Sequence, residues 1–177
     1  MAREKEILEY DESLYEEASE VVSLASGAGL TVGCAESCTG GLVSGCLTAV
    51  PGSSAVVRGG VVSYAIPVKH DVLGVPYEGV LDRPELGAVS SECASAMAEG
   101  ARLVLGCDVA ASITGIAGPG GAEPGKPVGT VWFGVSSALS TRTVRKILPG
   151  DRADVRRHAC HVAIGLLREA LMELAGA

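Results

Sequence analysis

The pattern of apolar and polar residues changes along the chain between the two periods that mark helices and strands. Helical spacing predicts helices over residues 10–26, 40–50, 67–73, 92–105 and 151–175. Short apolar runs predict strands over residues 30–35, 60–65 and 108–114, and a hairpin formed by residues 128–136 and 141–148. Helices that alternate with short buried strands are typical of a three-layer α/β/α sandwich with a mixed sheet. We therefore predict an α/β fold with a single domain over residues 1–177, in which residues 1–9 are a loosely ordered N-terminal extension.

Polar residues and glycines mark where several of these helices begin and end. Asp151 is expected to cap the last helix, because its side chain can accept hydrogen bonds from free amides, and Ser90 precedes the fourth. Thr39 or Ser37 is expected near the N-cap of the helix over 40–50. Residues 81–88 follow no clear period and stay unassigned.

The composition narrows the class of ligand. The 177 residues carry a net charge of −7, so the chain lacks the excess of Lys and Arg that a general nucleic-acid binder needs. Aromatic residues make up only 3%, too few for a platform on which single-stranded bases could stack. Glycine occurs 24 times, about twice its usual frequency of roughly 7%. A glycine-rich chain with few aromatics suggests tight turns and close backbone approach, which α/β enzymes use around the phosphates of small-molecule ligands.

No segment has the pattern of a targeting or membrane-spanning sequence. Residues 1–10 are charged and lack the apolar stretch of a signal peptide. Residues 37–57 carry no charge, but glycines and a proline interrupt them, which favours a buried helix followed by a turn. The six cysteines form no C-x-x-C pair and the three histidines no ligand array, so we expect reduced thiols, no metal and no cofactor. The sequence predicts a cytoplasmic protein with no membrane partner, and leaves open whether it forms a homo-oligomer.

The first candidate site is the string AESCTGG at residues 35–41, where a strand delivers polar residues to the start of a helix. Free amides and the positive end of the helix dipole at such a place favour an anion or a developing oxyanion. The glycines at its end would let a ligand approach the backbone. The alternative is a capped helix start whose small residues serve packing.

A serine and a lysine form the second candidate. Ser54 ends the turn PGSS at residues 51–54, and Lys69 follows fifteen positions later. A serine must lose its proton before it attacks a carbonyl, and a desolvated lysine can accept that proton because burial lowers its pKa. The histidines lie in no recognisable Ser-His-Asp motif. The alternative is that Lys69 is an ordinary solvated side chain.

Two further features suit a phosphate. Residues 115–121 (GIAGPGG) follow a predicted strand and match neither G-x-G-x-x-G nor a Walker A loop, but would form a backbone cradle at the strand's carboxyl end. Half of the 14 Lys and Arg residues lie between Arg142 and Arg168, and Arg152 and Arg156 share a face near the start of the last helix. The alternatives are a flexible loop and a basic face that is solvated or pairs with the acidic first helix.

Seven strings occur in a characteristic order: AESCTGG (35–41), PGSSA (51–55), Tyr64 with Lys69, GAVS (87–90), TGIAGPGG (114–121), KPVGTVWF (126–133) and GDR..VR (150–156). Together they closely resemble the CinA C-terminal domain family, from about residue 10 to the C-terminus. The resemblance implies an amidohydrolase. Characterised members of that family hydrolyse the carboxamide of nicotinamide mononucleotide to nicotinic acid mononucleotide and ammonia, in pyridine nucleotide salvage, with a Ser/Lys dyad and no metal.

The same resemblance assigns roles to residues of this chain. Lys69 matches the family lysine, and both Ser37 and Ser54 match family serines. We expect Ser37 to be the nucleophile, because it lies at a strand-to-helix corner beside backbone donors. Ser54 is the alternative nucleophile or a proton relay, and Tyr64 is expected among the catalytic residues. The residues expected to bind the substrate are Glu36, Thr39, Gly40, Gly41, Thr114, Gly115, Gly118, Gly120, Gly121, Arg152 and Arg156.

The chain departs from the family pattern between Tyr64 and Lys69. Many relatives have Ser-Asn-Glu-Ala there, whereas this chain has Ala-Ile-Pro-Val at residues 65–68. The change removes polar groups beside the lysine. The change favours the first alternative, a non-catalytic nucleotide-binding or regulatory domain, whereas the retained Ser37, Ser54 and Lys69 favour an enzyme. An amidase for a different nucleotide-like amide is the second alternative.

Overall fold

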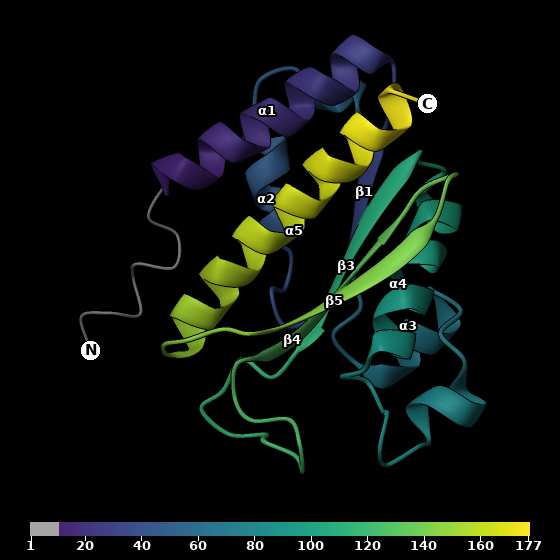
Figure 1. Cartoon of the computed structure of the whole chain (residues 1–177), viewed down its shortest axis with the longest axis vertical. Coiled ribbons are helices and arrows are strands. Elements are labelled where there is room, and N and C mark those ends of the chain that lie inside the picture. Colours follow the sequence, from purple (N-terminus) through teal and green to yellow (C-terminus); the bar gives the residue numbers. More distant parts are fainter. Residues whose placement is uncertain (1–10) are drawn as a thin grey trace.

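The computed structural model describes residues 11–177, which form one five-stranded sheet with helices on both faces (Figure 1). The strands are β1 (Val32–Glu36), β2 (Val57–Val62), β3 (Val109–Gly115), β4 (Thr130–Ser136) and β5 (Thr141–Ile147). They lie in the order β2-β1-β3-β4-β5. Strand β1 is parallel to β2 and β3, whereas β4 is antiparallel to β3 and β5. The predicted mixed sheet and the β4–β5 hairpin are confirmed, while the predicted extension over residues 1–9 lies outside the described residues.

The helices cover both faces of the sheet, which confirms the predicted three layers. They are α1 (Glu12–Ala28), α2 (Leu42–Thr48), α3 (Ile66–Asp71), α4 (Ser91–Leu105) and α5 (Arg152–Ala175). Helices α1, α2 and α5 lie together on one face, and α3 and α4 lie on the other (Figure 1).

Alternate strand residues bury apolar side chains in two cores. Ile113 of β3 and Phe133 of β4 belong to the larger core, under α1, α2 and α5. Ala35 of β1 and Met97 of α4 belong to the smaller one on the opposite face. Successive strand residues point to opposite faces, so the last two residues of β1, Ala35 and Glu36, face different layers. This alternation decides where the residues at the end of β1 place their side chains.

Two predicted helix starts are confirmed in atomic detail. The Ser90 hydroxyl accepts the Cys93 amide at 3.2 Å, at the start of α4. At the start of α5, the Asp151 carboxylate accepts the amides of Ala153 and Asp154 at 2.9 and 3.1 Å. The Asp154 carboxylate accepts the Asp151 amide in return, which completes a capping box. The first turn of α5, with its arginines, is therefore held firmly.

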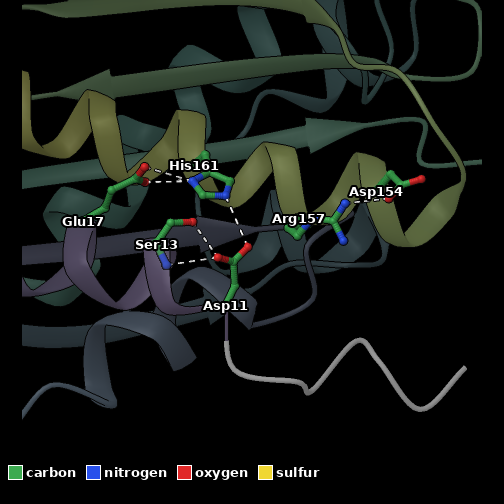
Figure 2. Close-up of polar contacts among 6 residues, drawn as sticks. All are labelled: Asp11, Ser13, Glu17, Asp154, Arg157 and His161. Carbon is green, nitrogen blue, oxygen red and sulfur yellow. Dashed lines mark hydrogen bonds and ion pairs between the residues drawn. The ribbon is translucent and has the colours of Figure 1, made fainter. Parts of the chain in front are cut away.

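Polar contacts join α1 to α5 around His161 (Figure 2). The His161 Nδ1 atom lies 3.0 Å from the Glu17 carboxylate, and its Nε2 atom lies 3.5 Å from Asp11, the N-cap of α1. Arg168 of α5 pairs with Glu20 of α1 at 3.1 Å. Such pairing was the alternative for Arg152 and Arg156, but these two donate to Gly118, Tyr64 and Thr39 instead of to α1.

Two predicted elements, the helix over 40–50 and the strand over 60–65, have different bounds in the structure. The helix over 40–50 is shorter, Leu42–Thr48, and its N-cap is Gly41 rather than Thr39 or Ser37. The buried carboxylate of Glu36 takes the amides that a capping serine or threonine would take. The strand over 60–65 lies three residues earlier, because pairing with β1 begins at Val57. Residues 81–88 are irregular and follow a short helical turn, Tyr77–Leu81.

The parallel strands β1, β2 and β3 all end at one edge of the sheet, and the segments that follow them gather there. Ligands of open α/β sheets bind at this carboxyl edge. All six cysteines are free thiols, and five of them are buried. Among residues 11–177, no helix combines the length and the apolar character that a membrane span requires.

Candidate active site

Ser37 and Lys69 meet at the carboxyl edge of the sheet. Ser37 is the first residue after β1, and its amide donates to the Ile113 carbonyl of β3 at 2.9 Å, which fixes its backbone. The Lys69 Nζ atom donates to the Ser37 Oγ atom at 2.9 Å. Ser37 is half-buried, whereas only 1% of Lys69 is exposed. The fold thus joins a reachable hydroxyl to a buried amine 32 positions away in sequence.

Helix α3 directs Lys69 into the protein. Pro67 lies in its first turn, as predicted, and Lys69 is its one buried residue. The neighbouring His70 is exposed, and its Nδ1 atom lies 2.9 Å from the Val75 carbonyl, which holds the chain beyond α3. The Lys69 Nζ atom also donates to the main-chain carbonyl of Ser63. The solvated alternative for Lys69 is therefore wrong.

Burial lowers the pKa of Lys69 below its ordinary value. A neutral amine carries one lone pair, and because the Ser63 carbonyl accepts an N–H, that lone pair can face Ser37. Burial raises the pKa of the nearby Cys38 and Cys93 thiols to about 11. Both thiols stay protonated at neutral pH. Ser37 is consequently the group that this amine can activate.

The Glu36 carboxylate is fully buried between β1 and α2. Its Oε2 atom accepts the amides of Gly41 and Val43 at 2.9 and 3.2 Å. Its Oε1 atom accepts the amide and the hydroxyl of Ser44 at 2.8 and 2.7 Å. Both oxygens are thus engaged by the start of α2, and the structure places Glu36 as the helix cap instead of at a surface that a substrate could reach.

The free amides beside Ser37 belong to the turn over residues 37–41, which connects β1 to α2. Glu36 occupies the amides at the start of α2, so they are not free for an oxyanion as the sequence predicted. Within residues 11–177, the amides of Cys38 and Thr39, which directly follow Ser37, donate to no backbone carbonyl, and the Cys38 amide contacts only its own thiol. Adjacent free amides beside a nucleophile can stabilise a developing oxyanion.

Arg156 of α5 holds the turn that carries Ser37. Its Nη2 atom donates to the Thr39 carbonyl at 3.0 Å. Gly40 lies against this guanidinium and has a φ of +63°, a conformation that favours glycine. In the described part of the chain, the buried Thr39 Oγ1 and Arg156 Nε atoms have no hydrogen-bond partner. Both groups keep hydrogen-bonding capacity at this turn.

Arg152 joins two segments at the rim of the site. Its Nη1 atom donates to the Gly118 carbonyl at 2.9 Å, and its Nη2 atom donates to the Tyr64 hydroxyl at 3.3 Å. Arg152 is exposed, and Tyr64 is 63% exposed. The structure thus places Tyr64 at the rim, in contact with Arg152 instead of with Ser37 or Lys69.

The glycine-rich segment that follows β3, residues 115–121, lies next to Arg152 at the rim of the site. The buried Thr114 hydroxyl donates to the Ala88 carbonyl at 2.5 Å, so it supports the neighbouring segment. A Cβ atom on Gly115 would lie 2.7 Å from the Thr130 carbonyl, so glycine is needed there for strand packing. Gly120 and Gly121 are exposed and leave their backbone open to a ligand. Thr114 and Gly115 thus have structural roles. The exposed backbone of Gly120 and Gly121 can still form a cradle for a phosphate.

Sequence reasoning missed three residues with structural roles, two of them at this site. Ser44 holds Glu36, Ser63 supplies the carbonyl for Lys69, and Lys126 donates to the Leu86 carbonyl at 2.7 Å, joining two loops. Only Lys126 had a signal, as the first residue of KPVGTVWF. The other two depend on contacts between segments that no local pattern reports.

Ser54 lies at the opposite end of the strands. It belongs to a short 3-10 turn (Ser53–Ala55) before β2, and the carbonyl of the following Val56 accepts the amide of Val32, the first residue of β1. Ser37 comes five residues after Val32, so at about 3.3 Å per residue the two serines are separated by about 16 Å or more. Within one chain, the structure does not bring Ser54 to Lys69.

These features define a class: an α/β sandwich with a mixed sheet and a buried lysine paired with a serine at its carboxyl edge. The chain belongs to the CinA C-terminal domain family, whose model matches residues 14–171. A CinA-like protein of Gemmatimonas aurantiaca is 50% identical over 147 residues, and one of Mycobacterium sp. strain JLS is 54% identical over 149 residues. The matches cover 83% and 82% of this chain but 34% of each relative. The chain therefore spans about one third of the length of these curated relatives.

Solved structures show the same fold. A protein of the CinA superfamily from Klebsiella pneumoniae 700603 has a TM-score of 0.84 and 34% identity, over 90% of this chain and 98% of that one. A competence/damage inducible protein from Agrobacterium tumefaciens has a TM-score of 0.83 and 38% identity, over 89% and 94% of the two chains.

Proposed function

We propose that the chain is a serine amidohydrolase that converts nicotinamide mononucleotide to nicotinic acid mononucleotide and ammonia. The observation that carries the proposal is the 2.9 Å contact between the half-buried Ser37 hydroxyl and the buried Lys69 amine. A serine nucleophile needs a base within hydrogen-bond reach, and burial keeps this amine available as a base. The substrate follows from the family resemblance.

The proposed reaction uses these groups in sequence. Lys69 takes the proton of Ser37 as the Oγ atom attacks the carboxamide carbon. The amides of Cys38 and Thr39 stabilise the oxyanion of the tetrahedral intermediate. Lys69 then returns the proton to the leaving nitrogen, which departs as ammonia and leaves an acyl group on Ser37. Water activated by Lys69 hydrolyses this ester and restores the free serine.

The phosphate of the substrate needs a local positive site, because the chain carries a net charge of −7. Arg152 suits this role: it is exposed, lies at the start of α5 and contacts the glycine-rich segment. Arg156 is engaged with the Thr39 carbonyl and supports the serine turn instead. We therefore assign the phosphate to Arg152 and the exposed backbone at Gly120 and Gly121.

The direct test is ammonia release from nicotinamide mononucleotide by the purified full chain. We expect steady turnover and a stoichiometric amount of nicotinic acid mononucleotide, both lost with Ser37→Ala. Binding without turnover would support the alternative, a nucleotide-binding or regulatory domain. Turnover of another nucleotide-like amide alone would support the second alternative, an amidase for a different substrate, which the exposed apolar Ile66 at the start of α3 favours.

Replacement of Arg152 by glutamine is expected to raise KM for nicotinamide mononucleotide by about ten- to a hundredfold and to change kcat little. A hydrogen bond to a charged group contributes roughly 1.5–3 kcal/mol, and a contact made equally in ground and transition states affects KM. The measurement compares the nucleotide with its dephosphorylated riboside in wild type and variant. Arg156→Gln is the matched control, expected to affect kcat more than KM. Equal use of both substrates by the wild type would contradict the assignment.

A further inference from the structure

The residue just before the proposed nucleophile has an unusual environment for a carboxylate. Glu36 is fully buried, yet it makes no ion pair with Lys69 or with an arginine among the described residues. Its partners are three amides and one hydroxyl at the start of α2. A buried carboxylate is expensive unless hydrogen bonds compensate it. Four such bonds, at 2.7–3.2 Å, therefore join the end of β1 tightly to α2.

These hydrogen bonds also fix the position of Ser37. The chain runs from Glu36 through Ser37 to Gly41 in six residues, and the Glu36 carboxylate accepts the Gly41 amide. Both ends of this turn are thus fixed to each other, and the reactive serine lies between them. Glycine at 40 and 41, with φ of +63° and +99°, allows the turn to be this tight.

A second observation shows that β2 leaves room for the Ser44 hydroxyl. A Cβ atom on Gly60 of β2 would lie 2.0 Å from the Ser44 Oγ atom. Only glycine at position 60 therefore leaves room for the hydroxyl that donates to Glu36. The atoms nearest to such a Cβ atom belong to Ser44 and Cys34, and not to Lys69 or to the turn over residues 37–41. The role of Gly60 is therefore to accommodate Ser44.

We infer that Glu36, Ser44 and Gly60 form a positioning unit that holds the Ser37 hydroxyl at its reactive distance from Lys69. Glu36 acts through the turn and does not touch the substrate. A misplacement of reacting groups by about 1 Å can cost about 10²-fold in rate. The inference rests on the proposed function only in its choice of Ser37 as the nucleophile.

The test uses three variants of the full chain. Glu36→Gln places an amide donor against main-chain donors, and we expect kcat to fall by about 10²-fold. Ser44→Ala removes one neutral-to-charged hydrogen bond and should lower kcat by about two- to tenfold. Gly60→Ala should match Ser44→Ala, since the new Cβ atom displaces the same hydroxyl. In all three, KM and the pH at which activity rises should stay near the wild-type values, because the substrate contacts and Lys69 remain.

The matched control is Asp108→Asn. Asp108 accepts the Thr31 amide and hydroxyl at 2.8 and 2.6 Å, a similar set of bonds at the opposite edge of the sheet. The Asp108→Asn variant should lower the melting temperature about as much as the Glu36 and Ser44 variants do, without changing kcat. Loss of activity in proportion to lost stability in all variants, the control included, would overturn the inference.

A second readout separates this inference from the proposed substrate. A fluorophosphonate probe, which phosphonylates activated serines with loss of fluoride and needs no nucleotide, reports Ser37 reactivity directly. Slower labelling of Ser37 in the three variants, with normal labelling in Asp108→Asn, supports the inference even if nicotinamide mononucleotide is not turned over. Labelling at wild-type rates in the variants, or no labelling of Ser37 in the wild type, overturns it.

Discussion

Replacement of Lys69 by methionine is expected to lower kcat by about 10²–10⁴-fold, the usual effect of removing a positioned acid–base group. Methionine fills a similar volume in this buried position but cannot accept the Ser37 proton. KM should change little, because Lys69 contacts the nucleophile and the Ser63 carbonyl rather than the rim where the substrate enters. Steady-state ammonia release at neutral pH measures both constants. A near-normal kcat in this variant would contradict the role of Lys69.

The pH dependence gives an independent check of the same assignment. Lys69 is active as a base when neutral, so kcat/KM should rise with pH through its lowered pKa, which lies below the ordinary 10.5. Lys69→Arg is the matched control: it keeps a positive charge that cannot be removed, and it should be inactive throughout. Both variants should lack the rising limb of the profile.

The same pKa has a consequence for stability. The unfolded chain keeps the ordinary pKa, so between the lowered value and 10.5 it binds more protons at Lys69 than the folded chain does. The contribution of Lys69 to the free energy of unfolding therefore increases as pH rises through this range. Lys69→Met removes this dependence, and the variant should stay folded at neutral pH.

Elements with strong local signals were predictable from the sequence. Helix α5 has a capping box at Asp151, and the start of α4 has Ser90, so both starts follow from short-range hydrogen bonds. The α2 start was not predictable, because its N-cap is Gly41 and its free amides bond to Glu36 of the preceding strand instead of to a nearby serine or threonine. The register of β2 was missed for a similar reason: pairing with β1 sets it, and the edge strand has no continuous apolar run.

Some residues of the candidate site were likewise predictable from local sequence, and others were not. Ser37 was favoured because a strand-to-helix corner beside backbone donors was expected there, and the structure places it half-buried directly after β1. The sequence motifs contained two serines, however, and no local pattern says which one reaches Lys69. The parallel pairing of β1 and β2 separates them, since Ser37 follows one strand and Ser54 precedes the other. Arg152 and Arg156 looked equivalent in sequence, but one helical turn gives them different partners.

Replacement of Ser37 by alanine is expected to abolish the covalent intermediate and to lower kcat by about 10³-fold or more, because no hydroxyl remains beside Lys69. Ser54→Ala is the matched control. It removes an exposed hydroxyl at the opposite edge of the sheet, and kcat should stay within about threefold of wild type. Acid quenching during turnover, followed by intact-mass and peptide mass spectrometry, locates the acyl group. The wild type and Ser54→Ala should carry it on Ser37, and Ser37→Ala should carry none. An adduct on Ser54, or its loss in Ser54→Ala, would reverse the assignment and would require a different chain to supply the lysine, since one chain keeps Ser54 and Lys69 at opposite ends of β2.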